Sequence, residues 1–192
     1  MTDTRFNSDY LKKTDNVATG YAKADFKDLQ PAPRMTWGNV SGAGGIYSSV
    51  HDMSKWMRMQ LAGGVYTDAS GKEQRLFSKK RQDGMWSIVT PIPVNDPSVP
   101  ELKPAKPNFL GYGEGWQLSD YRGNKLVWHT GGWPGMVSRL TLVPDRKVSV
   151  ISADLSDDDD VRRVEQAISA DESVTLLVNN AGLGGQQVVA TA

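Results

Sequence analysis

The 192-residue sequence contains no cysteine, which excludes disulfide bonds, a thiolate nucleophile and cysteine-ligated zinc. It also lacks any run of about 18 apolar residues, so it predicts no membrane-spanning helix. Basic and acidic residues number 22 each, and the formal net charge is zero. Proteins that hold nucleic acid by charge carry an excess of basic residues, so we expect no nucleic-acid partner.

The sequence also has few metal-ligating residues and predicts no signal peptide. His51 and His129 are the two histidines, too few for a protein-only zinc site without added carboxylates. The acidic run 157–160 lacks the glycine and the distal glutamate of a calcium loop, and we expect no metal site. Residues 1–5 lack the basic-then-apolar order of a signal peptide, which on its own predicts a cytoplasmic location.

The composition changes along the chain. The last aromatic residue is Trp133 and the last proline is Pro144. Residues 1–151 carry 20 basic and 14 acidic groups, a net of +6, whereas residues 152–192 carry 2 basic and 8 acidic groups, a net of −6. The charge difference alone suits a chance run in a C-terminal tail. Because aromatics and prolines change with it, we predict two domains, 1–151 and 152–192.

Two helices are predicted in the first part. Ser49 is a suitable cap for a helix that Gly63 and Gly64 end. Its apolar positions recur at helical spacing and predict one buried stripe, formed by Val50, Met53, Trp56, Met57 and Leu61. A second helix is predicted to follow Ser78 and to run to about residue 85. Residues 2–37 read as irregular, and 90–107, with six prolines, as an extended connection.

From Gly111 the pattern changes to β-structure. Arg122, Gly123 and Asn124 favour a hairpin turn, and the alternating segments around it predict an antiparallel meander. The predicted strands cover 117–121, 125–129, 136–143 and 147–152. The predicted fold class is therefore α+β, an antiparallel sheet with flanking helices.

Three stretches of the first part resemble the serine β-lactamase-like family, which includes class C β-lactamases, penicillin-binding proteins, esterases and peptidases. They are Ser-Gly-Ala-Gly-Gly-Ile-Tyr-Ser-Ser-Val-His-Asp-Met-Ser-Lys-Trp-Met (41–57), Gly-Tyr-Gly-Glu-Gly-Trp (111–116) and His-Thr-Gly-Gly-Trp-Pro-Gly-Met (129–136). The resemblance implies that residues 1–151 are the C-terminal half of such a domain, with a partial β-lactamase/transpeptidase-like fold. It also implies acyl transfer or hydrolysis of β-lactams, esters or D-amino peptides.

The same resemblance implies a substrate-binding role for His129, Thr130, Gly131 and Gly132. The first three match the family's Lys/His-Thr-Gly motif, on the strand that edges the active site. A cation or hydroxyl there suits a substrate carboxylate or assists proton transfer, and the two glycines allow a ligand close to the backbone. Considered without the motif, His129 would be an ordinary strand histidine beside Trp128.

The family's nucleophile motif, Ser-x-x-Lys, and its Tyr-x-Asn or Ser-x-Asn motif occur nowhere in the 192 residues. We therefore predict that the chain alone is inactive as a hydrolase and that catalysis needs another polypeptide to supply the missing half. Two alternatives remain at this point. One is a non-catalytic binding module using the surface near His129 and Trp133, and the other is a product without an evolved function. The family is often periplasmic or secreted, which leaves the compartment open.

Residues 152–185 resemble a different family, the short-chain dehydrogenases/reductases. Asp154-Leu155, an acidic-start helix at about 157–170 and Asn179-Asn-Ala-Gly182 after an apolar strand match one β-α-β unit of that family. The resemblance implies vestigial cofactor-binding roles for Asp154, Leu155, Asn179 and Gly182. A Gly-rich phosphate loop and a Tyr-x-x-x-Lys pair are missing, so we expect no dehydrogenase activity and no bound cofactor.

The two resemblances together predict a chimera joined near residues 148–153. We expect the tail helix 157–170 to cover the sheet through Val161, Val164 and Ile168. Strands that the missing half would pair with are predicted to leave exposed sheet edges, which favour self-association.

Overall fold

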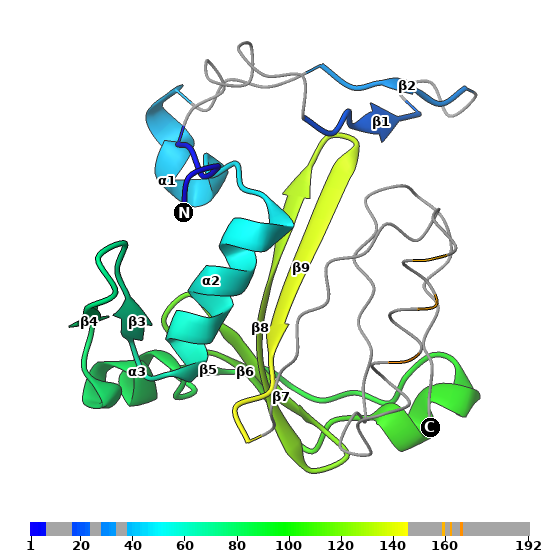
Figure 1. Ribbon diagram of the computed structural model, residues 1–192. Coiled ribbons are helices and arrows are strands. Elements are labelled where there is room, and N and C mark those ends of the chain that lie inside the picture. Colours follow the sequence, from blue (N-terminus) through cyan, green and yellow to red (C-terminus); the bar gives the residue numbers. More distant parts are fainter. Residues whose placement is uncertain are drawn as a thin grey trace. The chain divides into compact units, whose positions relative to one another are not determined.

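The computed structural model describes residues 1–6, 17–23, 28–33, 38–145 and the single residues Asp159, Arg162 and Gln166 (Figure 1). The chain divides into two compact units. The first comprises Met1–Met53, Thr130–Arg139 and Ser152–Ala192, and the second comprises Ser54–His129 and Leu140–Ile151. Each unit is described by itself below.

A five-stranded sheet has the order β5-β6-β7-β8-β9, so that neighbours in the chain are neighbours in the sheet. Its strands are β5 (Thr90–Pro91), β6 (Leu110–Tyr112), β7 (Gln117–Tyr121), β8 (Asn124–Trp133) and β9 (Met136–Leu142). The ladders that join β5, β6, β7 and β8 are all antiparallel. The predicted meander is therefore confirmed, while the predicted strand 147–152 lies outside the described residues.

The turn between β7 and β8 is tighter than predicted. Tyr121 pairs with Asn124, so the loop consists of Arg122 and Gly123 alone, and Asn124 already belongs to β8. Arg122 has a φ of 49° and Gly123 a φ of 79°. Two successive residues with positive φ are what a type I′ hairpin turn requires, and this turn follows the right-handed twist of the flanking strands. Arg122 is a strained residue in this position.

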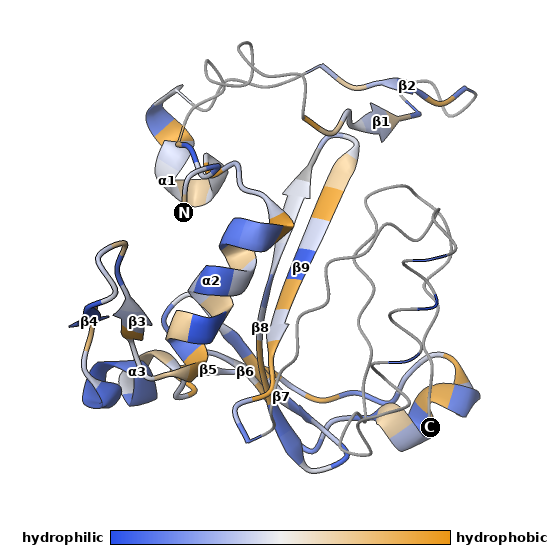
Figure 2. Cartoon of the chain, in the orientation of Figure 1, coloured by the Kyte–Doolittle hydropathy of each residue, from blue (hydrophilic) through white to orange (hydrophobic). Residues whose placement is uncertain are grey.

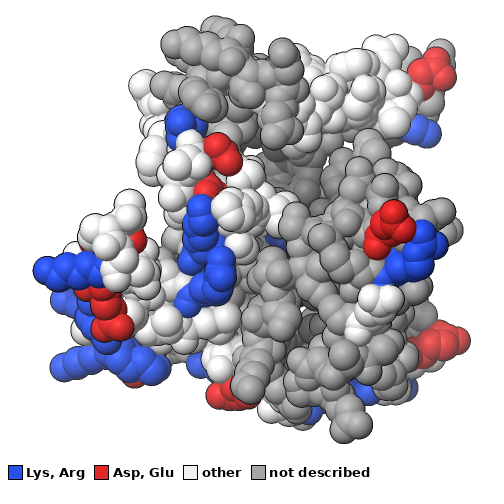
Figure 3. Space-filling model, viewed as in Figure 1, with Lys and Arg blue, Asp and Glu red and all other residues white. Residues whose placement is uncertain are grey.

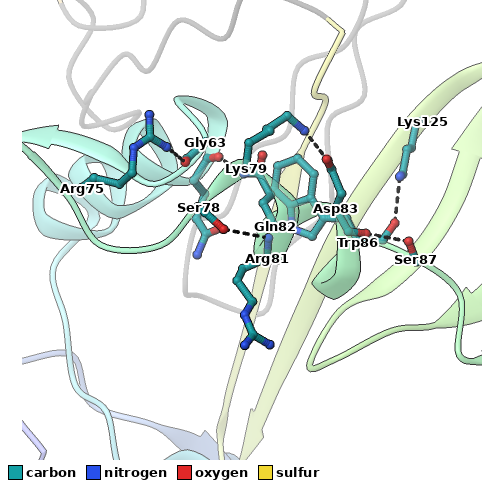
Figure 4. Close-up of polar contacts among 11 residues, drawn as sticks. Gly63, Arg75, Ser78, Lys79, Arg81, Gln82, Asp83, Trp86, Ser87 and Lys125 are labelled. Atoms are coloured by element: carbon teal, nitrogen blue, oxygen red, sulfur yellow. Dashed lines mark hydrogen bonds and ion pairs between the residues drawn. The ribbon is translucent and has the colours of Figure 1, made fainter.

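Both predicted helices are confirmed. α2 is Val50–Leu61 and begins with the N–H of Asp52 donating to Ser49 Oγ at 3.2 Å. Gly63 and Gly64, with φ of 66° and 90°, follow its end. α3 is Lys79–Met85, and Ser78 Oγ accepts from the N–H of Arg81 (Figure 4). The caps satisfy N–H groups that have no partner inside a helix.

The predicted stripe of α2 is wrong at its first member. Val50 is 61% exposed, whereas Asp52 is fully buried and Met59 is 6% exposed. Asp52 and Met59 are seven positions apart, two helical turns, so they share a face that Val50 does not. Asp52 is tolerated there because its carboxylate accepts from the N–H of Asp3 and the hydroxyl of Thr4.

The core of the second unit is built on tryptophan. Trp116 stacks on Trp56, with ring centroids 5.4 Å apart, and meets Trp86 edge to face at 6.3 Å. The other members of the cluster are apolar side chains of α2, α3, β7, β8 and β9, namely Met57, Leu61, Met85, Leu118, Val127, Leu140 and Leu142. Figure 2 shows apolar bands along β9. Its first four residues are exposed, and Leu142 at its end is completely buried in this core.

The proline-rich segment is less extended than predicted. It contains β5 and a 3₁₀-helix, η3 (Pro100–Ala105), with Pro100 at its start. The fixed φ of proline suits the first turn of such a helix, which explains the difference. An unpredicted antiparallel hairpin joins β3 (Val65–Thr67) to β4 (Glu73–Arg75).

The first unit has short elements. They are β1 (Tyr21–Ala22), β2 (Gln30–Pro31), the 3₁₀-helix η2 (Gly38–Val40) and α1 (Ser41–Gly44). The antiparallel pairing of β1 with β2 was not predicted, because residues 2–37 read as irregular. The N–H of Tyr21 donates to the carbonyl of Gly135 at 3.1 Å, which ties β1 to the turn between β8 and β9.

Little of the tail is described. Asp159, Arg162 and Gln166 are helical, and Arg162 forms an ion pair with Asp159 at 2.5 Å. The rest of the predicted helix, its contact with the sheet and the predicted β-α-β unit lie outside the described residues. Within the described part of the chain, no helix is long and apolar enough to span a membrane.

Candidate functional site

The four predicted substrate-binding residues, His129 to Gly132, are consecutive on β8. The strand was predicted to end at His129, but it continues through both glycines to Trp133. All four residues are exposed. β8 lies between β7 and β9 in the sheet, and its ladder with β7 runs from Asn124 to Trp128. The motif therefore lies beyond the last pair with β7, where the side of the strand that faced β7 suits pairing with an extended ligand.

Gly131 lies close to β9. A Cβ atom built on Gly131 would stand 2.5 Å from Ser138 Oγ, whereas one on Gly132 would meet no described atom within 4 Å. The two glycines therefore differ: the first allows the neighbouring serine to approach, and the second leaves open space over the backbone.

His129 is held by a residue that the sequence did not single out. Its Nε2 lies 3.1 Å from Tyr112 Oη, and the two rings meet at 62° with centroids 6.1 Å apart. Tyr112 comes from β6, in the Gly-Tyr-Gly-Glu-Gly-Trp stretch. A lone aromatic residue between two glycines was the available signal, because glycines on both sides bring the backbone close to its neighbours.

The strand is anchored by the two residues that precede the motif. Val127 is completely buried in the core, and the indole N–H of Trp128 donates to Ser119 Oγ at 3.1 Å. Because side chains alternate along a strand, Val127 fixes the face on which His129 projects.

Asp52 connects the start of α2 to residues near the beginning of the sequence, within the first unit. Its Oδ2 accepts from the N–H of Asp3 at 2.8 Å and from Thr4 Oγ1 at 2.9 Å, and Thr4 Oγ1 also bonds Ser48 Oγ at 2.8 Å. A buried carboxylate needs such donors to offset its desolvation. The sequence analysis did not predict these contacts.

Among the described residues, two carboxylates have a lowered pKa, and neither belongs to the predicted site. Burial raises the pKa of Asp120, but hydrogen bonds from Asn108, Gly123 and Phe109 outweigh burial and lower it overall. The pKa of Asp68 falls to about 2, mainly through the hydroxyl of Ser70 and then through Gln74 and the N–H of Lys72.

Basic side chains gather around α3 and β4 in Figure 3. The exposed members of this cluster are Lys72, Arg75, Lys79, Lys80 and Arg81. Several are engaged locally, as Figure 4 shows. Lys79 pairs with Asp83, and Arg75 donates to the carbonyl of Gly63 at 2.8 Å.

The predicted cofactor-binding residues Asp154, Leu155, Asn179 and Gly182 lie outside the described residues. Among those that are described, no three His, Asp or Glu side chains are grouped as a metal-binding cluster.

Comparison with known proteins agrees with the fold. The chain is 26% identical over 137 residues to an unguisins hydrolase of Aspergillus campestris, a match to 71% of this chain and 22% of that protein. It is 29% identical over 157 residues to an unguisins hydrolase of Aspergillus violaceofuscus, covering 74% of this chain and 26% of that protein. The chain thus spans about a quarter of the length of these curated relatives.

A solved structure resembles the chain as well. It is the octameric penicillin-binding protein homologue from Pyrococcus abyssi, with a TM-score of 0.53 and 23% identity, over 76% of this chain and 28% of that one. This likeness supports the partial β-lactamase-like α+β fold. The Beta-lactamase family profile matches residues 1–160, most of the chain and nine residues more than the predicted first domain. The chain belongs to the Beta-lactamase family.

Proposed function

We propose that this chain supplies the substrate-binding strand of a serine hydrolase that transfers or hydrolyses acyl groups. The observation that carries the proposal is the exposed run His129-Thr130-Gly131-Gly132 on β8. Family membership and relatives named as hydrolases support hydrolase chemistry in general. The substrate class, a β-lactam, an ester or a D-amino peptide, is part of the proposal.

In this proposal the strand binds and orients the acyl group. Peptide N–H and C=O groups of β8 pair with the substrate backbone, and Gly132 leaves room for it. His129 and Thr130 supply side-chain hydrogen bonds to a substrate oxygen. Hydrogen-bond donors that are already in position stabilise the negative charge that develops on the carbonyl oxygen, because the donors do not have to reorganise during the reaction.

The nucleophile comes from elsewhere in this proposal, because Ser-x-x-Lys is absent from the 192 residues. A serine hydroxyl from a second polypeptide would attack the carbonyl carbon, and its proton would pass to the accompanying lysine. The acyl bond to the leaving group then breaks as the leaving group is protonated. The chain alone would bind substrate and form no acyl-enzyme.

The test separates binding from acylation. The chain is incubated with a fluorescent penicillin and with a fluorophosphonate, and labelling is read on a denaturing gel. In parallel, benzylpenicillin is titrated while amide shifts of residues 129–132 are followed by NMR. We expect saturable shifts and no covalent label, with the shifts lost in His129→Ala. A covalent label on this chain would contradict the missing nucleophile, and absence of any shift would contradict binding at β8.

A binding module without catalysis is the second candidate. The same exposed strand favours this candidate. A binding module would bind the ligand, and adding a polypeptide that carries the nucleophile would produce no turnover. Adding a family member's Ser-x-x-Lys segment as a separate polypeptide distinguishes the two. Acylation that depends on both polypeptides supports the hydrolase, and binding without acylation supports the module.

The chimera remains a proposal for residues 152–192, supported by the dehydrogenase-like sequence around Asp154 and Asn179. In it, the tail is a remnant without its own chemistry, and the whole chain can also be a fusion product without an evolved function. We expect no NADH fluorescence enhancement and no change in melting temperature with NAD. Saturable NADH binding would overturn the remnant assignment.

We also propose that the chain self-associates. In this proposal, a second copy of the chain contacts the start of β9. Met136 and Val137 are exposed there, Val137 by 82%. Apolar side chains on an open strand favour pairing with another strand. Light scattering during size-exclusion chromatography should show concentration-dependent dimers that Val137→Lys weakens. A monomer at all concentrations would contradict this proposal.

A further inference from the structure

The hydrogen bond between Tyr112 and His129 crosses a strand. Tyr112 lies on β6 and His129 on β8, with β7 between them in the sheet. Two strand spacings amount to roughly 10 Å, a gap that the two side chains close together. The two residues are 17 positions apart and belong to two different stretches of the family resemblance.

The backbone of β6 is held firmly around Tyr112. A Cβ on Gly111 would lie 2.6 Å from the side chain of Ile88, and one on Gly113 would lie 2.5 Å from the carbonyl of Met85. On the other edge, the N–H of Val89 donates to the carbonyl of Tyr112 at 2.9 Å. These close approaches restrict the strand, so the phenol is presented from a fixed base.

The direction of the hydrogen bond decides the state of the imidazole. A neutral histidine carries its proton on one ring nitrogen and accepts at the other. Among the described residues, Tyr112 Oη has no hydrogen-bond partner other than His129 Nε2. The phenolic proton is satisfied within the protein when it is donated to Nε2, and this places the imidazole proton on Nδ1.

We propose that Tyr112 is a positioning residue that holds His129 as the Nδ1–H tautomer and fixes the orientation of its ring. Nδ1–H is then a donor on the exposed edge of the ring, directed to a carbonyl or carboxylate oxygen of an acyl ligand. This last step rests on the proposed function of β8. The tautomer itself does not, because it is set in the free protein.

The tautomer is read directly by NMR. Long-range ¹H–¹⁵N spectra of ¹⁵N-histidine protein are recorded at a pH where imidazole is neutral. The chain has two histidines, and His51→Gln assigns the signals. We expect the Nδ1–H pattern for His129 and a shift toward the Nε2–H pattern in Tyr112→Phe, while His51 is unchanged. An Nε2–H pattern in the unsubstituted chain, or an identical His129 pattern in Tyr112→Phe, would overturn the proposal.

The ligand step has its own readout. Benzylpenicillin titrated against Tyr112→Phe should bind about 3- to 10-fold more weakly than against the unsubstituted chain, the range expected for one lost hydrogen bond. Equal affinity would overturn the link between tautomer and ligand. If the tautomer changes as expected and neither protein binds the penicillin, the positioning role stands and the proposed function fails.

Folding is checked in the same samples. Near-UV circular dichroism of the tryptophan cluster should be the same with and without the substitution, since the phenol of Tyr112 is outside that cluster. If Tyr112→Phe does not fold, the spectrum of the unsubstituted chain still decides the tautomer.

Discussion

Asn108 donates twice to one carboxylate: its backbone N–H to Asp120 Oδ1 at 2.6 Å and its side-chain amide to Asp120 Oδ2 at 2.7 Å. The N–H of Gly123 adds a third bond at 3.1 Å. Asp120 therefore joins the end of the proline-rich segment to the β7–β8 turn. Asp120 is 5% exposed, whereas Asn108 and Gly123 are exposed.

Asp120→Ala should destabilise the chain by about 2 kcal/mol, because it removes hydrogen bonds from Asn108 and Gly123 to a charged carboxylate. Urea unfolding followed by tryptophan fluorescence measures the change. Asp96→Ala is the matched control, since Asp96 forms an exposed ion pair with Lys106 and should cost about 0.5 kcal/mol or less. Equal effects of the two substitutions would refute the anchoring role of Asp120.

The same carboxylate predicts a pH dependence. The pKa of Asp120 is lowered in the folded chain, so its ionised form is stabilised by folding. This contribution is present above the ordinary value of 3.8 and is lost as pH falls through the lower folded value. The stability difference between the unsubstituted chain and Asp120→Asn should therefore shrink below that pH. A difference that grows on acidification would contradict the sign.

Asp68 should titrate well below its ordinary value of 3.8. Its pKa is about 2, lowered first by the hydroxyl of Ser70. A ¹³C carboxyl titration should give this midpoint, and Ser70→Ala should raise it. The exposed carboxylate of Asp96 serves as an internal comparison. A midpoint for Asp68 near 3.8, its ordinary value, would show that the loop contacts are not maintained in solution.

Arg122→Asn should stabilise the hairpin by about 0.5 to 1 kcal/mol, because asparagine tolerates the positive φ that arginine adopts at a cost. The substitution gives up the contact of Arg122 with the Tyr121 ring, whose centroid is 5.4 Å away, and this reduces the gain. Arg122→Val should destabilise instead. Thermal melts of the three proteins test the order, and a stabilising valine would disprove the strain.

Gly131→Ala should destabilise by about 1 kcal/mol, the cost of an off-rotamer side chain, because Ser138 Oγ must rotate away from the added methyl group. Ser138→Ala in the same chain should restore most of that loss. Gly132→Ala, with open space at the same strand, is the structural control and should change stability little. Independent effects of Gly131→Ala and Ser138→Ala would indicate that the two residues do not share this contact.

Local signals allowed much of the fold to be predicted. Ser49, Ser78 and the Gly63–Gly64 pair mark helix ends through their own hydrogen bonds and dihedrals, and Arg122-Gly123 marks a hairpin. Contacts between distant segments could not be predicted in this way. The burial of Asp52 depends on Asp3 and Thr4, nearly fifty positions earlier, and no spacing rule connects them.

The candidate site also has a part that the sequence predicts and a part that it does not. His129 to Gly132 form a continuous motif, so the sequence identified them together. Tyr112 became visible only when the order β6-β7-β8 placed its phenol beside the imidazole. Its two flanking glycines were noticeable, but which side chains they would meet depends on packing by Met85 and Ile88.

The bond from Tyr21 to Gly135 bears on how the chain is made. On a ribosome adding about 5 to 20 residues per second, the roughly 110 residues between these partners take roughly 5 to 25 s to synthesise. During that interval β1 has no hairpin tip to contact, while α2 and the β3–β4 hairpin already have their local partners. The contact between β1 and the β8–β9 turn therefore forms only after both of these strands have been synthesised.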